Sequence, residues 1–132
     1  MNGKRRLLIV SAMVALLCGC PFDLIHVEQT PARLDTTGAG RGPFELASEV
    51  NVTIGAGYRR VLKKGTRWRY VGRLAQGDVF TTSDQVLTVE ASNIHEAYIV
   101  VQSRKLVGFY LPVERSFTSL PQNVDLPITD LP

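Results

Sequence analysis

Strict alternation between Leu46 and Ile54 sets the fold class that we expect for this chain. One set of alternating positions is rich in Leu, Val and Ile, and the positions between them hold Ala, Glu, Asn and Thr. Successive side chains of a strand point to opposite faces, so this pattern predicts a half-buried strand. No window of the sequence has a convincing helical period, and further short β-rich segments follow. The sequence therefore predicts an all-β domain.

Two of these β-rich segments flank a short polar connection. Tyr58 to Leu62 and Arg67 to Leu74 are separated by Lys63 to Thr66, in which Gly65 can adopt a positive φ angle. Two strands joined by so short a turn favour direct antiparallel pairing. We therefore expect a hairpin over residues 58–73, with Leu74 completing its second strand.

The most apolar segments come later in the chain. Tyr98 to Val101 and Leu106 to Leu111 flank the turn residues Gln102 to Lys105. Continuous apolar runs of this length predict strands that are covered on both faces. Pro112 lacks the N–H that a ladder needs, so the second strand is expected to end there.

About six to seven short strands in residues 44–120 favour a small antiparallel barrel, because closing the sheet removes its edges. The stretch from Gly65-Thr66-Arg67-Trp68 to Gly77-Asp78-Val79-Phe80 resembles bacterial Src-homology-3-like domains, in which a Trp-bearing strand precedes a Gly-rich turn and a further strand. That resemblance implies a small barrel and a peptidoglycan-binding role. Beyond residue 120, three prolines in residues 121–132 predict an extended tail.

The start of the chain carries an export pattern. Lys4, Arg5 and Arg6 precede an apolar run from Leu7 to Leu17, which is too short to span a bilayer as a helix. Leu17-Cys18-Gly19-Cys20 resembles the bacterial lipobox, which implies removal of residues 1–19 and a covalent lipid on Cys20. An uncleaved N-terminal anchor helix is the alternative.

The segment after Cys20 differs in composition from the rest. Residues 20–43 are rich in small residues and lack periodicity, which predicts a flexible tether between the lipid and a domain of residues 44–120. Pro21, rather than Asp, follows Cys20, so the analogy with lipoprotein sorting implies an outer membrane location facing the periplasm. We therefore expect the membrane itself to be one partner, through the lipid anchor.

Charge and cysteine usage change once the signal segment is removed. The chain has 15 Lys+Arg and 12 Asp+Glu, and three of the basic residues leave with the signal, so basic and acidic residues balance. This balance argues against nucleic acid as a partner. Of the two cysteines, Cys18 is removed and Cys20 is acylated, so no disulfide or cysteine metal site is expected.

The sequence offers little that points to catalysis. His26 and His95 do not stand in metal-ligand spacings, and no nucleophile elbow, phosphate loop or dinucleotide motif is present. His95 and Glu96 are adjacent on a predicted strand and so would point to opposite faces. We expect no catalytic residues, no metal, no cofactor besides the lipid and no small-molecule substrate.

One segment stands out by its charge. No acidic residue occurs between Val50 and Gly77, and alternation places Trp68 and Tyr70 in the core while the neighbouring arginines point outward. Outward cations can contact lipid phosphates, an anionic glycan or an acidic protein patch, or can simply keep a hairpin soluble. Tyr58 could add an aromatic contact. The candidate anion-binding residues are Arg59, Arg60, Lys63, Lys64, Arg67, Arg69 and Arg73.

Two functional hypotheses follow. The first is a non-enzymatic cell-envelope lipoprotein whose β-domain acts as an interaction or scaffold module, as an accessory to a larger envelope protein assembly. The second is a module that binds peptidoglycan or another envelope glycan through the basic residues of 58–73.

Overall fold

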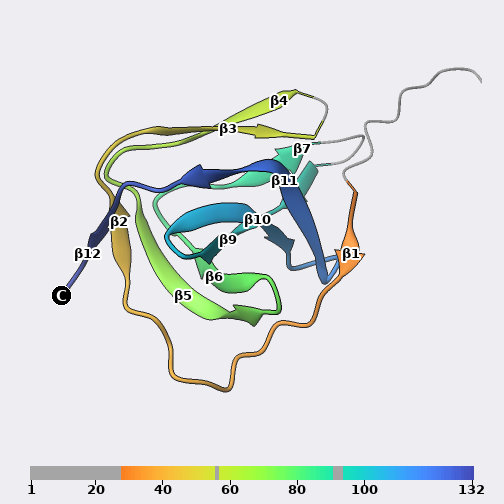
Figure 1. Cartoon of the computed structure of the whole chain (residues 1–132), viewed down its shortest axis with the longest axis horizontal. Coiled ribbons are helices and arrows are strands. Elements are labelled where there is room, and N and C mark those ends of the chain that lie inside the picture. The colour runs from red at the N-terminus through yellow and green to blue at the C-terminus, as the bar shows by residue number, and fades with distance from the viewer. Residues whose placement is uncertain (1–27, 56, 91–93) are drawn as a thin grey trace, which may run out of the picture.

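A computed structural model describes residues 28–55, 57–90 and 94–132, and all of its regular structure there is β (Figure 1). The predicted signal segment and Cys20 lie outside these ranges. In the described part of the chain, no helix is long and apolar enough to cross a membrane. The twelve strands found in these ranges are β1 (Thr30–Pro31), β2 (Phe44–Leu46), β3 (Val50–Ile54), β4 (Tyr58–Leu62), β5 (Arg67–Leu74), β6 (Gly77–Thr81), β7 (Thr88–Glu90), β8 (Ile94–Glu96), β9 (Tyr98–Gln102), β10 (Lys105–Leu111), β11 (Ser116–Asp125) and β12 (Ile128–Asp130).

Eight strands form one antiparallel sheet in the order β1-β11-β10-β9-β6-β5-β2-β12, and β3-β4 and β7-β8 are separate pairs. β11 runs into β12 through only Leu126 and Pro127, although the two strands lie near opposite ends of the sheet. The sheet must therefore curve strongly, as Figure 1 shows. The Leu126 N–H donates to the carbonyl of Arg104 at 3.1 Å and fixes this crossing. Among the described residues no pairing of β1 with β12 closes the sheet.

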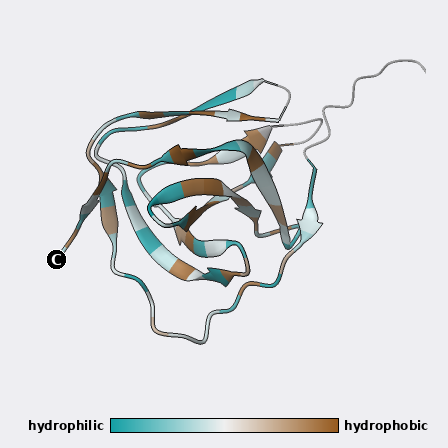
Figure 2. Ribbon diagram, viewed as in Figure 1, coloured by the Kyte–Doolittle hydropathy of each residue, from teal (hydrophilic) through white to brown (hydrophobic). Residues whose placement is uncertain are grey.

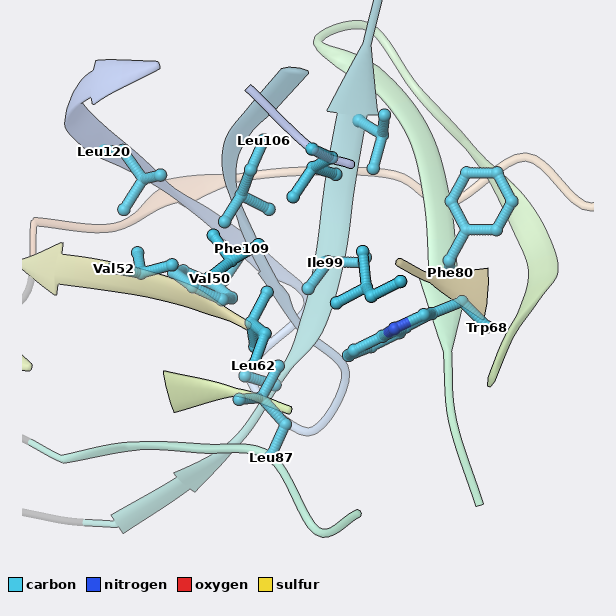
Figure 3. Close-up of a cluster of buried hydrophobic side chains, with 14 of the residues drawn as sticks. Val50, Val52, Leu62, Trp68, Phe80, Leu87, Ile99, Leu106, Phe109 and Leu120 are labelled. Atoms are coloured by element: carbon cyan, nitrogen blue, oxygen red, sulfur yellow. The ribbon is translucent and has the colours of Figure 1, made fainter. Parts of the chain in front are cut away.

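The two faces of the sheet carry different hydrophobic clusters. The larger cluster fills the concave side, where the β3-β4 pair contributes Val52 and Leu62 and the sheet contributes Trp68, Ile99 and Phe109 (Figure 3). Alternation along β9 sends Val100 to the other face, where a smaller cluster lies. That second cluster consists of Leu74, Val79, Val100, Tyr110 and Phe117.

The segment before β2 covers the smaller cluster. Leu34 packs against it, and the backbones of Asp35 and Arg73 exchange two hydrogen bonds, of 2.9 and 2.8 Å. Gly72 makes room for this contact, since a Cβ there would lie 2.8 Å from the Asp35 carbonyl oxygen. Residues 30–35, expected to belong to a flexible tether of residues 20–43, are instead part of the packed structure. The reason is that Ala32 and Leu34 bury apolar side chains of the outer sheet face, which the hydrophobic effect favours.

The central strands agree with the sequence prediction. Ile99 and Val100 are fully buried although they point to opposite faces, so β9 is covered on both sides. β10 ends at Leu111, directly before Pro112. In Figure 2 the brown hydrophobic segments of β9 and β10 lie in the middle of the molecule.

Three sequence predictions need correction. The expected hairpin of residues 58–73 does not form, because β4 pairs with β3 while β5 pairs with β2 and β6. Residues 121–132 are extended but not a free tail, because β11 continues to Asp125 and β12 pairs with β2. The described residues between 44 and 120 hold more than the expected six or seven strands, since strands as short as β2 and β8 escaped the sequence pattern.

Candidate functional site

The connection between β4 and β5 is a corner where the chain passes from one sheet to another. Gly65 takes a φ of 80°, and its N–H donates to the Leu46 carbonyl at 2.8 Å. The Thr66 hydroxyl donates to the Lys63 carbonyl at 2.6 Å and closes the turn. Because Gly65 is held against β2, the chain turns away from β4 and Lys63 and Lys64 remain on the surface.

A groove of about 500 Å³ lies beside this corner, between β4 and the loop that precedes β7. Gln85 joins the two walls. Its Nε2 donates to the Val61 carbonyl at 2.9 Å, and its Oε1 accepts the Lys63 N–H at 3.5 Å. The glutamine therefore satisfies backbone groups along β4 in place of a neighbouring strand. We call this feature the basic groove, and its lining residues are Arg59, Arg60, Val61, Lys63, Asp84, Gln85 and Val86.

Arg60 connects the groove to the β7-β8 pair. Its Nε donates to the Thr88 carbonyl at 2.8 Å, and its terminal nitrogen hydrogen bonds to the Thr88 hydroxyl. The guanidinium also lies 4.9 Å from the centre of the Tyr58 ring, which is a cation-π contact. Arg60 and Tyr58 are therefore engaged within the protein, and Arg60 holds β4 against β7.

Asp84 fixes the far wall of the groove to β5. Its Oδ2 accepts the Arg67 N–H at 2.9 Å, and its own N–H donates to the Thr82 hydroxyl at 3.2 Å. The Arg67 side chain remains exposed. Together with Gln85, this contact gives the groove two walls that are bonded to the body of the protein.

Arg73 does not belong to the groove. Its Nε lies 3.0 Å from Asp78 Oδ1, and Arg41 Nε lies 3.1 Å from the second oxygen of the same carboxylate. The hydrogen bond that Arg73 donates to Asp78, together with the charge of that carboxylate, raises the pKa of Arg73. Asp78 is therefore already shared between two arginines. Of the seven candidate cations, Arg73 is the one placed farthest along β5 from the corner.

The alternation predicted for β5 is confirmed at its start. Trp68 is 1% exposed and belongs to the larger core cluster, while Arg67 and Arg69 point to solvent. The indole nitrogen of Trp68 is buried and has no hydrogen-bond partner among the residues that the structure describes. Tyr70 is half-buried and meets Phe80 edge to face at a ring distance of 5.8 Å. Trp68 is thus a core residue.

Scans against protein-family models, curated proteins and solved structures found no match. The resemblance of residues 65–80 to Src-homology-3-like domains therefore stays a prediction. Its local part is present, since β5 and β6 pair antiparallel around the turn at Ala75 and Gln76.

The basic groove includes features that sequence reasoning missed. Val86 is 87% exposed and Val61 is 38% exposed, and both line the groove among the cations. Gln85 was not a candidate either, although it bridges the walls. A signal for Val86 was present, because it follows Ser83 and Asp84 in a turn-like stretch where an apolar side chain has little to pack against.

His95 is not among the residues that line the basic groove. Its side chain contacts Glu114, whereas the neighbouring Glu96 interacts with Tyr98. The His95 Nδ1 lies 2.5 Å from Glu114 Oε1, which links β8 to the β10-β11 turn. Burial of the Tyr98 hydroxyl, and then the Glu96 charge, raise the pKa of Tyr98. Within the described ranges no group of three or more His, Cys, Asp or Glu side chains is arranged to hold a metal ion.

A second hollow lies where the curved sheet brings β12 near the β9-β10 turn. This cleft, of about 450 Å³, has a floor that includes Phe44 and Phe80. Its charged groups are paired, Arg41 with Asp78 and Arg104 with Asp130 at 3.6 Å. The basic groove differs from this cleft because, within the described part of the chain, no ion pair involves its Arg59 or Lys63.

Proposed function

We propose that this chain is a cell-envelope lipoprotein whose β-domain acts as a non-enzymatic interaction module, held at the membrane by lipid on Cys20. The observation that carries this proposal is Leu17-Cys18-Gly19-Cys20, directly after a basic start and an eleven-residue, mostly apolar run. A lipid on the first mature residue is an anchor, and stable attachment comes from acyl chains buried in the bilayer.

An interaction role is supported by the surface of the domain. The basic groove presents exposed cations and exposed valines on walls that are bonded to the core. Rigid walls reduce the entropy that is lost when a partner binds. A module of this kind supplies a contact surface to a membrane or an envelope assembly.

The anchor is tested by two single substitutions in a bacterial host fed a labelled fatty acid. Cys20→Ala abolishes incorporation of the label and leaves the signal segment attached, because the processing step acts on the acylated precursor. Cys18→Ala is the matched control and leaves labelling and processing intact, since Cys18 lies within the removed segment. Equal labelling of the Cys20→Ala chain contradicts the proposal.

Location follows from the residue after the acylated cysteine. Because Pro21 stands where an Asp would retain a lipoprotein in the inner membrane of a two-membrane envelope, we propose the outer membrane, facing the periplasm. Density-gradient separation of the two membranes from the host cells measures this directly.

Peptidoglycan or another envelope glycan is the second candidate partner. The observation in its favour is the exposed cationic corner at Lys63, Lys64 and Arg67, which suits an anionic polymer. A pull-down with isolated sacculi separates it from a membrane or protein partner.

A further inference from the structure

Apolar exposure and positive charge coincide on one surface. In the described residues the large hydrophobic side chains that stay exposed are Val61, Val86, Ile94 and Val113, and the first two line the basic groove. A surface that served only for solubility would not place valines among its cations. Exposed apolar residues surrounded by cations mark a surface that binds a membrane or a protein partner.

The cations of this surface are free to meet an anion. Arg59 and Lys63 flank Val61 on the outer side of β4, and Lys64 and Arg67 continue the charge around the corner. No ion pair within the described ranges involves any of these four side chains. The one acidic lining residue, Asp84, accepts the backbone N–H of Arg67, and its single negative charge is outnumbered by these four cations.

Val86 is held outward by its neighbours. Gln85 is fixed to the Val61 carbonyl and Asp84 to the Arg67 backbone, so the loop that carries Val86 is bonded on two sides. The valine therefore projects from a supported position. It can enter an apolar layer without the loop having to become ordered first.

The length of chain before β1 limits how far the domain can lie from a bilayer that holds Cys20. β1 begins at Thr30, so ten chain steps lead from Cys20 to the ordered sheet. Fully extended, they span at most about 33 to 36 Å. A tether ending at residue 43 would allow roughly 75 to 80 Å. The packing of residues 30–35 therefore keeps the domain within about one domain diameter of the headgroups.

We propose that the basic groove docks onto anionic phospholipid headgroups of the membrane that holds Cys20. Lys and Arg side chains would contact lipid phosphates, and Val61 and Val86 would enter the boundary between headgroups and acyl chains. The valines favour a membrane over an anionic glycan, because a glycan offers no hydrocarbon layer. This docking rests on the proposed lipid anchor.

The test uses the mature, lipidated chain in vesicles, with one added thiol. Since Cys18 is removed and Cys20 is acylated, Val86→Cys supplies the single free thiol for an environment-sensitive fluorophore. Val113→Cys is the matched control, because Val113 is similarly exposed at 76% but lies in the β10-β11 turn. Accessibility to acrylamide, a neutral aqueous quencher, is compared between phosphatidylcholine vesicles and vesicles that also contain phosphatidylglycerol.

Docking predicts that the label at position 86 becomes shielded, with a blue-shifted emission, only on phosphatidylglycerol vesicles. The label at position 113 stays accessible on both. Each cation near an anionic surface strengthens association about fivefold, so Lys63→Gln, Lys64→Gln and Arg67→Gln together lower the equilibrium constant for docking about 100-fold. Neutralising Arg33, Lys105 and Arg115 removes the same charge elsewhere and leaves the shielding unchanged.

Equal quenching at positions 86 and 113 on phosphatidylglycerol vesicles overturns the docking proposal, as does shielding that survives the triple substitution at the groove. Shielding of position 86 by isolated sacculi in place of vesicles assigns the surface to a glycan. Failure of the chain to float with phosphatidylcholine vesicles shows that the lipid anchor itself is wrong, so the two proposals fail in different measurements.

Discussion

Gly108→Ala tests how closely β10 packs against β11. Among the glycines of the described residues, Gly108 is the one where an added Cβ would come nearest to another atom. Gly108 stands opposite Ser119 in the β10-β11 ladder, where the register shifts. A Cβ at this position would lie 2.3 Å from the Thr118 carbonyl oxygen and 2.6 Å from the Phe117 ring. Contacts under 3.0 Å are essentially never seen for a real Cβ, so the carbonyl has to retreat by about 0.7 Å.

The cost of that movement can be worked out from the surroundings. Phe109 and Leu111, on the same strand, are fully buried, so β10 cannot shift without disturbing the core. Overpacking of a dense core costs about 1 to 3 kcal/mol, and weakening one ladder hydrogen bond adds about 1 kcal/mol. We expect the free energy of unfolding to fall by about 3 kcal/mol, which lowers the melting temperature by roughly 12 to 24 °C for a domain of this size.

Thermal unfolding followed by circular dichroism measures the shift, with Gly38→Ala as the control. A Cβ at Gly38 meets nothing within 4 Å, so this variant should unfold within about 1 kcal/mol of the unmodified protein, toward higher stability. If Gly108→Ala melts no lower than Gly38→Ala, the close packing of β10 against β11 is refuted.

Two further predictions concern the core and the arm before β2. Phe109→Ala removes a fully buried ring of the larger cluster and should lower the free energy of unfolding by about 3 to 5 kcal/mol, measured by urea denaturation; a loss under 1 kcal/mol contradicts its placement. The Thr37 hydroxyl and N–H donate to Asp35 Oδ1 and lower the pKa of Asp35, so the folded carboxyl should titrate below its value in the unfolded chain. This depressed pKa contributes stability that is present above the unfolded pKa, near 4, and is lost as the pH falls through the folded value. Carbon-detected NMR of Asp35 checks the titration, and Thr37→Val should raise the pKa toward that of a peptide.

Local pattern predicted strands well and their partners poorly. The alternation before Ile54 and the apolar runs around residues 98–111 fixed β3, β9 and β10, because burial of one or both faces shows in the sequence. The partner of β4 was predicted wrongly, because Lys63 to Thr66 has the residues of a hairpin turn. Its backbone instead bonds to Leu46, a contact with a distant strand that no short window contains.

The candidate site was predictable in charge and not in geometry. The run of cations from Arg59 onward is visible in the sequence, but their availability depends on long-range contacts. Arg73 meets Asp78 and Arg60 meets Thr88, and Gln85 caps β4 across 24 positions of chain. Alternation along one strand carries no information about which side chains another segment will bind. Only the three-dimensional structure shows which of these cations bond to other residues of the protein and which are exposed.

The packing of the arm before β2 shortens the free chain between Cys20 and the domain, which composition does not show. Small residues and glycines in 36–42 suggested a long, free tether, yet Leu34 and the Asp35 backbone are needed to cover the smaller hydrophobic cluster and pair with Arg73. Because residues 30–35 pack on that face, they do not add to the length of free chain between Cys20 and the domain. With the proposed lipid on Cys20, the start of β1 would lie within about 33 to 36 Å of that lipid. The docking proposed for the basic groove would then occur at the high local concentration of lipid that so short a connection gives.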